Sequence, residues 1–136
     1  MTKATSSAKE QSKKKNPQVL IVEDDTFLSG MYVTKLELEG IDVELASDGQ
    51  QAINVVQKRR PDVILLDVVM PKMSGFDVLT WLKKTKETKD IPVILLTNLG
   101  EKEDVQKGLK LGAVDYLIKA HFLPSEVVEK IKRIVR

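Results

Sequence analysis

The sequence predicts an α/β fold, a doubly wound parallel sheet of five strands with five helices. Two observations predict this class. Short runs rich in Val, Ile and Leu alternate strictly with amphipathic stretches of helical length, and most of these runs lack the polar alternation of a strand that is exposed on one face. Parallel neighbours need a crossover connection, and right-handed crossovers can place helices on either face of a sheet. We therefore expect helices to cover both faces.

Five segments are predicted to be strands. Ile41, Val43 and Leu45 alternate with polar residues, which indicates a half-covered strand at the edge of the sheet. The other four segments are continuous apolar runs, which are typical of strands buried on both faces. These four runs are residues 19–22, 63–66, 91–96 and 114–118.

Five amphipathic segments between these runs are predicted to be helices. The last of them places Val127 and Ile131 on one face and charged residues elsewhere, and Pro124 suits its first turn. Gly40 and Gly112 suit the ends of two earlier helices, where a left-handed residue is common. The five predicted helices span residues 26–39, 49–59, 75–85, 102–111 and 124–135.

The composition excludes several classes of protein. A length of 136 residues suits a single domain. The absence of cysteine excludes a disulfide scaffold, a thiolate zinc site and a cysteine nucleophile. Residues 1–17 hold five lysines and one glutamate and show no hydrophobic periodicity, so we expect a disordered Lys- and Ser-rich tail and a folded domain over residues 18–136.

The charge of the body argues against two kinds of partner. Without the tail, the chain carries 17 basic and 19 acidic residues, so we expect no direct nucleic-acid binding. No apolar run approaches the roughly 18 residues that a membrane helix needs, and no apolar segment follows the N-terminal lysines as in a signal peptide. The sequence therefore predicts a cytoplasmic protein that does not insert into a membrane.

Polar and charged residues follow four of the five predicted strands. In parallel sheets, function gathers at the carboxyl ends of the strands, so these residues are the candidates for a site. Carboxylates that meet there repel one another by up to about 4 kcal/mol per pair at 4 Å and an effective dielectric constant of 20. A divalent cation with oxygen ligands, such as Mg²⁺, would offset that repulsion. The residues in question are Glu23, Asp24, Asp25, Asp67, Thr97 and Lys119.

Four motifs at these strand ends resemble the receiver domain of two-component response regulators. Asp67 precedes Thr97 by 30 residues, and Thr97 precedes Lys119 by 22, intervals similar to those of many receivers. The resemblance covers about residues 18–136 and implies a flavodoxin-like sheet with strand order 2-1-3-4-5. The motifs are VLIVEDD at 19–25, LLDVVMPKMSG at 65–75, LLT at 95–97 and DYLIK at 115–119.

The resemblance implies a signalling domain and not an enzyme that turns over a separate substrate. Asp67 would accept a phosphoryl group from a sensor histidine kinase or a histidine phosphotransfer protein. Lys119 and Thr97 would contact the phosphoryl oxygens, and Tyr116 would turn inward behind Thr97. This movement would switch the surface that binds a downstream target protein.

The resemblance also implies a Mg²⁺ site. Asp24, Asp25 and Asp67 would hold the ion together with the backbone carbonyl of Val69. Because this last ligand is a carbonyl, the apolar side chain of Val69 does not forbid metal binding.

Three positions depart from the family pattern. Ala120 follows Lys119 where many receivers have proline, and a non-proline cis bond costs about 3 to 4 kcal/mol, so we expect a trans bond there. Val69 and Leu99 stand where side chains of the family flank the path of the hydrolytic water, and neither can orient a water molecule. We therefore expect slow self-dephosphorylation.

Other interpretations stay open. The chain is either a stand-alone receiver or a fragment of a longer regulator. Homodimerisation through the surface around Lys107, Lys110 and Tyr116 is an alternative, but no residue specifically supports it. A receiver-like docking module that is never phosphorylated is a second hypothesis. A flavin or nucleotide protein of the same topology is disfavoured, because the loop after the first strand is acidic and no Gly-rich phosphate loop occurs.

Overall fold

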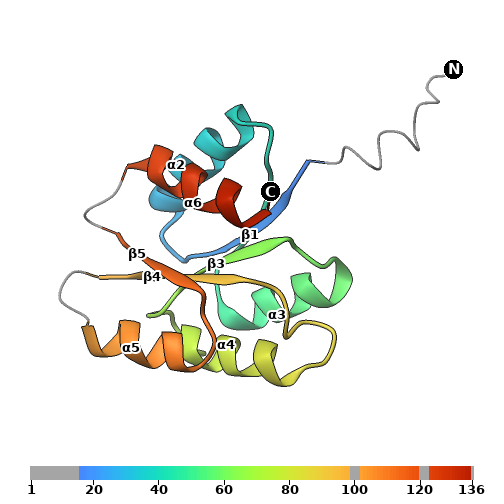
Figure 1. The fold of residues 1–136 in the computed structure, drawn as a ribbon, viewed down its shortest axis with the longest axis vertical. Coiled ribbons are helices and arrows are strands. Elements are labelled where there is room, and N and C mark those ends of the chain that lie inside the picture. The colour runs from blue at the N-terminus through green and yellow to red at the C-terminus, as the bar shows by residue number, and fades with distance from the viewer. Residues whose placement is uncertain (1–15, 99–101, 120–122, 136) are drawn as a thin grey trace, which may run out of the picture.

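Figure 1 shows the fold in a computed structural model, which describes residues 16–98, 102–119 and 123–135. Five parallel strands form one sheet in the order β2-β1-β3-β4-β5, as predicted. The strands are β1 (Gln18–Val22), β2 (Asp42–Ala46), β3 (Val63–Asp67), β4 (Val93–Thr97) and β5 (Asp115–Ile118). The helices are α2 (Thr26–Leu38), α3 (Gly49–Lys58), α4 (Gly75–Lys84), α5 (Lys102–Lys110) and α6 (Pro124–Val135).

Helices cover both faces of the sheet. Helices α2 and α6 lie on one face, and α3, α4 and α5 lie on the other (Figure 1). Each layer has its own apolar core, because alternate side chains of a strand point to opposite faces. One core packs Leu36 and Ile131 against strand residues such as Ile21, and the other packs Leu82 against Leu66. The predicted doubly wound architecture is confirmed.

The central strands and the edge strands differ in burial. Every residue of β3 and β4 is buried, as the continuous apolar runs predicted. The same prediction was wrong for residues 114–118, where Val114 is 54% exposed and Tyr116 is 38% exposed. The reason is the position of β5, which pairs only with β4 and forms the free edge of the sheet. The apolar residues of this edge strand therefore bury one face of the strand and not both.

The connection from β3 to α4 brings the start of a helix against the end of a strand. The N–H of Gly75 donates to the carbonyl of Val68 at 2.9 Å. A Cβ atom at position 75 would lie 2.2 Å from the backbone oxygen of Asp67, so only glycine fits this close approach. Ser74 caps α4 in a capping box with Asp77. This connection fixes the backbone around Asp67.

Several expectations fall at or beyond the edge of the described residues. Of the predicted tail, Asn16 and Pro17 are described, and the carbonyl of Pro17 accepts a hydrogen bond from β2. Residues 1–15, Leu99 and Ala120 lie outside the described residues. Among the helices that the structure describes, none is long and apolar enough to cross a membrane.

Candidate functional site

Three predicted site residues lie at the carboxyl ends of adjacent strands. Asp67 ends β3, Thr97 ends β4, and Lys119 directly follows β5. These ends meet because β3, β4 and β5 pair in parallel, and the N–H of Lys119 donates to the carbonyl of Thr97 at 2.8 Å. Asp67 and Thr97 are each only 2% exposed. The topology thus brings together a carboxylate, a hydroxyl and an ammonium group from three distant parts of the chain.

Lys119 forms ion pairs with two buried carboxylates. Its Nζ atom lies 2.9 Å from Oδ2 of Asp67 and 3.0 Å from Oε1 of Glu23. The side chains of Glu23 and Asp67 are 1% and 2% exposed, and that of Lys119 is 19% exposed. Water screens such pairs weakly, so each contact holds the ammonium group firmly in place.

The carboxylates that converge here differ in one member from the predicted set. Glu23, Asp24 and Asp67 each offer an oxygen atom within 4.8 Å of the others. Asp25 is outside this group. Its Oδ1 atom accepts hydrogen bonds at 3.0 Å from two backbone N–H groups in the first turn of α2, so Asp25 is the N-cap of that helix. Glu23, and not Asp25, therefore groups with Asp24 and Asp67 in this structure.

A signal for this difference was present in the sequence. Asp25 stands immediately before an amphipathic segment that begins at Thr26, which is the position and the residue type of an N-cap. Glu23 is only 3% exposed, and its Oε2 atom accepts the N–H of Asp25 at 3.1 Å. The acidic run therefore divides between a buried carboxylate at the strand end and a capping carboxylate at the helix start.

Burial and neighbouring charges shift the pKa values of Glu23 and Lys119. Burial, together with the charge of Asp67, raises the pKa of Glu23 to about 7, although hydrogen bonds from the Asp25 N–H and from Lys119 oppose the shift. Burial also acts against the charge of Lys119. Its hydrogen bonds to Asp67 and Glu23 outweigh this effect and raise the pKa of the ammonium group. Lys119 is therefore a permanent cation at neutral pH.

A divalent cation fits these residues. Lys119 forms ion pairs with two of the three carboxylates, those of Glu23 and Asp67. Burial, together with the charge of Asp67, still raises the pKa of Glu23. Carboxylate oxygens are the ligands that Mg²⁺ takes in proteins, usually a few of them with several waters. The donor set and its charge are therefore suited to Mg²⁺.

The remaining predicted residues lie around this cluster. The N–H of Val69 donates to Oδ1 of Asp67 at 3.1 Å, and the side chain of Val69 is 62% exposed. The hydroxyl of Thr97 donates to the carbonyl of Asn98 at 3.4 Å. Tyr116 is 38% exposed on the edge strand.

Comparisons with known proteins agree with this arrangement. Residues 19–132 match the family described as the response regulator receiver domain. The phosphate regulon transcriptional regulatory protein PhoB of Escherichia coli is 40% identical over 119 residues, which are 88% of this chain and 52% of PhoB. The chemotaxis protein CheY4 of Vibrio cholerae matches with a TM-score of 0.81 and 34% identity, over 88% of this chain and 98% of CheY4.

A third relative was solved with a metal ion. The receiver domain of the sensor histidine kinase PA1611 from Pseudomonas aeruginosa has a magnesium ion coordinated in its active site cleft. It matches with a TM-score of 0.80 and 28% identity, over 88% of this chain and 98% of that domain. This chain spans about half the length of the curated relatives it matches, from 45% to 52%. Its fold, its strand-end residues and these matches agree, and the chain belongs to the receiver domain family of two-component response regulators.

Proposed function

We propose that Asp67 accepts a phosphoryl group from the phosphohistidine of a sensor histidine kinase or a histidine phosphotransfer protein. An oxygen of the Asp67 carboxylate attacks phosphorus, the P–N bond breaks, and its electron pair stays on the imidazole nitrogen. The product is an acyl phosphate. The observation that carries this proposal is the ammonium group of Lys119, held 2.9 Å from Asp67 in a buried, acidic environment. There it would pair with the oxygens of the incoming phosphoryl group.

Glu23, Asp24, Asp67 and the backbone carbonyl of Val69 would hold Mg²⁺. When bound, the ion would offset the negative charge that these carboxylates share with the phosphoryl oxygens. We place Glu23 in the set in preference to Asp25, because Oδ1 of Asp25 already accepts two hydrogen bonds from α2. Buried Glu23 also orients Lys119, since the two side chains form an ion pair at 3.0 Å.

The switch would combine Thr97 and Tyr116. The hydroxyl of Thr97 has only a long, weak hydrogen bond to the neighbouring carbonyl, so it can turn toward a phosphoryl oxygen at little cost. Tyr116, now exposed on the edge strand, would move inward behind it. The surface formed by α5, β5 and α6, which includes Lys107 and Lys110, would change and recruit a downstream target protein.

The phosphorylated state is proposed to be long-lived. Val69 is 62% exposed near Asp67, and its apolar side chain can neither accept a proton from a water molecule nor orient one. Leu99, the second apolar position of this argument, lies outside the described residues. Replacing both by residues that bind water, as in Val69→Asn with Leu99→Glu, should shorten the lifetime of the acyl phosphate.

The binding partners other than the phosphodonor, namely a downstream target, nucleic acid or a second copy of the chain, are known only as predictions. The match to PhoB concerns half of a transcriptional regulatory protein, so a DNA-binding output is not inferred for this chain. We propose that this domain acts through a protein target and has no direct contact with nucleic acid. A cytoplasmic location is likewise a prediction from the sequence, and a homodimer stays an open alternative that no residue supports.

Intact-mass spectrometry with a small phosphodonor tests the phosphoacceptor. The wild-type chain with Mg²⁺ should gain the mass of one phosphoryl group, and the chain with a chelator should gain much less. Asp67→Asn should gain none, because its amide cannot form the acyl phosphate. Asp90→Asn is the matched control, since Asp90 is an exposed aspartate in the connection before β4.

Two results would contradict the proposal. Uptake of phosphate by Asp67→Asn would place the acceptor elsewhere. Failure of the wild type with several phosphodonors, at a Mg²⁺ concentration that saturates other receivers, would favour the docking module that is never phosphorylated.

A further inference from the structure

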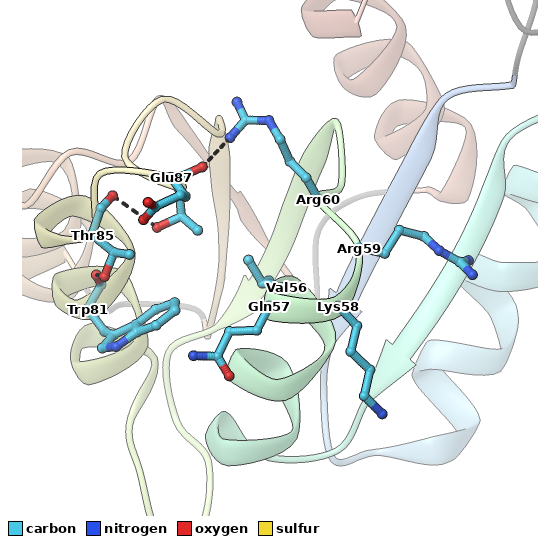
Figure 2. A pocket seen from close by; sticks show the side chains of 9 residues that line it. Val56, Gln57, Lys58, Arg59, Arg60, Trp81, Thr85 and Glu87 are labelled. Atoms are coloured by element: carbon cyan, nitrogen blue, oxygen red, sulfur yellow. Dashed lines mark hydrogen bonds between the residues drawn. The ribbon is translucent and has the colours of Figure 1, made fainter.

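A second concave site lies at the opposite end of the sheet, where the strands begin. It is a pocket of about 580 Å³ between the C-terminal ends of α3 and α4. This volume is in the range of sites that bind small molecules. Figure 2 shows the side chains that surround it. The lining residues are Val56, Gln57, Lys58, Arg59, Arg60, Trp81, Thr85, Glu87 and Thr88.

The pocket combines one aromatic ring with positive charge. Trp81 is half-buried against the apolar core, and its ring points toward Val56 and Gln57 on α3 (Figure 2). Lys58, Arg59 and Arg60 are cationic lining residues, and Glu87 is the one acidic residue in the lining. The ends of Lys58 and Arg59 point away from Trp81, so Arg60 is the cation held at the pocket (Figure 2). A flat aromatic surface near a cation is the pattern that binds a planar base together with phosphate.

The hydrogen bonds show which polar groups are available to a ligand. The hydroxyl groups of Thr85 and Thr88 each donate to a backbone carbonyl at 2.7 Å, so they are already used. The side chains of Gln57 and Lys58 form no hydrogen bond or ion pair with any residue that the structure describes. Gln57 therefore offers the two N–H donors of its amide group and one carbonyl acceptor beside the ring of Trp81.

Arg60 forms the rim of the pocket. Its Nη1 atom donates to the carbonyl of Glu87 at 2.6 Å, which bridges the chain after α3 to the chain after α4 (Figure 2). This bond uses one of the five N–H donors of the guanidinium group and leaves the others for a ligand. Held in this way, the guanidinium group loses less freedom when it binds an anion.

We propose that this pocket binds a nucleotide, with its base stacked on Trp81 and its phosphates paired with Arg60. Gln57 contributes hydrogen bonds to the base, and Lys58 adds to the positive potential. An acidic peptide would also be attracted by the cations. The half-buried ring and the limited volume favour a ligand that combines one flat ring with a compact anionic group. This site is independent of Asp67 and does not rest on its phosphorylation.

The fluorescence of Trp81, the only tryptophan in the chain, reports directly on this pocket. Titration with ATP, excited at the red edge of the indole band where adenine does not absorb, should give saturable quenching. Adenosine and tripolyphosphate, which carry the ring or the charge alone, should each bind at least about tenfold more weakly than ATP. A poly-glutamate peptide is the probe for the competing occupant.

Variants connect the signal to the named residues. Arg60→Gln should weaken ATP binding about tenfold, because it removes a charge-assisted contact. Gln57→Ala should weaken it severalfold, and the exposed side chain of Gln57 has no partner whose loss could unfold the protein. Lys35→Gln, which removes a cation on α2 whose side chain is 37% exposed, should leave ATP binding unchanged. Phosphorylation of Asp67 should be the same in all three variants.

Three outcomes would overturn the proposal. The first is no saturable quenching by ATP. The second is binding of tripolyphosphate or poly-glutamate as tight as that of ATP, which would show a surface for polyanions and not a nucleotide site. The third is an equal loss in Arg60→Gln and Lys35→Gln, which would show attraction to net charge alone.

Discussion

The two ends of the parallel sheet carry opposite charge in different environments. The carboxyl ends of the strands hold buried acidic side chains around Lys119, with Glu23 and Asp67 only 1% and 2% exposed. The other end is basic, because residues 57–62 and 83–90 contain seven cationic and three acidic residues. These cations are mostly exposed, and the Arg59–Glu44 pair there, at 3.8 Å, has side chains that are 68% and 48% exposed.

This difference in burial determines how strongly the charges at each end interact. Two unit charges 4 Å apart interact with about 1 kcal/mol in water and about 4 kcal/mol at an effective dielectric constant of 20. Side chains at the buried end also cannot regain water when their partner is removed. Substitutions at the acidic end should therefore alter stability and chemistry together, whereas substitutions at the basic end should alter binding with little change in stability.

The largest effect is expected for Lys119→Met. This change leaves the buried carboxylates of Glu23 and Asp67 without their cation, and breaking a buried ion pair costs about 3 to 5 kcal/mol. We expect a loss of about 3 kcal/mol in the free energy of unfolding, measured by urea denaturation at neutral pH in the presence of a chelator. Adding Asp67→Asn to Lys119→Met should recover part of the loss, because it removes one of the unpaired charges.

The matched control for this prediction is Lys110→Met, which removes an exposed cation from α5. It should change the free energy of unfolding by less than about 0.5 kcal/mol. If Lys119→Met and Lys110→Met cost the same, the buried pairs would have no special weight, and the contrast between the two ends would be lost.

The second prediction concerns the backbone next to Asp67. In Gly75→Ala, the new Cβ atom would lie 2.2 Å from the carbonyl oxygen of Asp67 and 2.9 Å from Cα of Val68. The start of α4 must move away, and overpacking of this kind costs about 1 to 3 kcal/mol. We expect a loss of about 2 kcal/mol by thermal or urea unfolding, together with slower phosphorylation. Gly30→Ala is the control, because a Cβ atom there meets nothing within 4 Å. An equal loss in both variants would exclude the close approach as the cause.

A smaller effect should separate Asp24 from Asp25. Asp25→Ala removes the N-cap of α2 and should cost about 1 kcal/mol of stability. Asp25→Ser keeps a capping oxygen and should retain both stability and Mg²⁺-dependent phosphorylation. Asp24→Ser should lose that phosphorylation without loss of stability, because it removes a proposed metal ligand that caps nothing. If Asp25→Ser abolished phosphorylation as completely as Asp24→Ser, the ligand pair first predicted from the sequence would be favoured.

The substitutions at Asp24 and Asp25 also concern the part of the site that the sequence could not predict. Strand order, helix positions and the meeting of Asp67, Thr97 and Lys119 follow from the alternation of apolar runs and from the rule that parallel strand ends share an edge. The choice between Glu23 and Asp25 could not be made in this way. It depends on where β1 ends and α2 begins, and element boundaries are uncertain by one or two residues. The N-cap position of Asp25 was the local clue.

Burial at the edge strand was missed for a different reason. A run such as 114–118 is equally apolar whether it lies inside a sheet or at its edge, because neighbouring strands are not visible in the run itself. Pairing of β5 with β4 alone leaves Tyr116 exposed. The pocket at Trp81 was also hidden, since it forms only where the ends of two helices, far apart in sequence, approach each other.

The smallest effect is expected at the basic end, for Arg59→Gln. Its guanidinium group lies 3.8 Å from Glu44, and both side chains are largely exposed, so water and salt screen the pair. We expect a loss of less than about 0.5 kcal/mol in the free energy of unfolding, and this loss should vanish in high salt. Urea denaturation at two salt concentrations measures it. A loss near that of Lys119→Met would mean that burial does not determine how much a charged pair contributes to the free energy of unfolding of this domain. A negligible loss, with ATP binding at Trp81 reduced only slightly, would agree with Arg60 as the main phosphate contact.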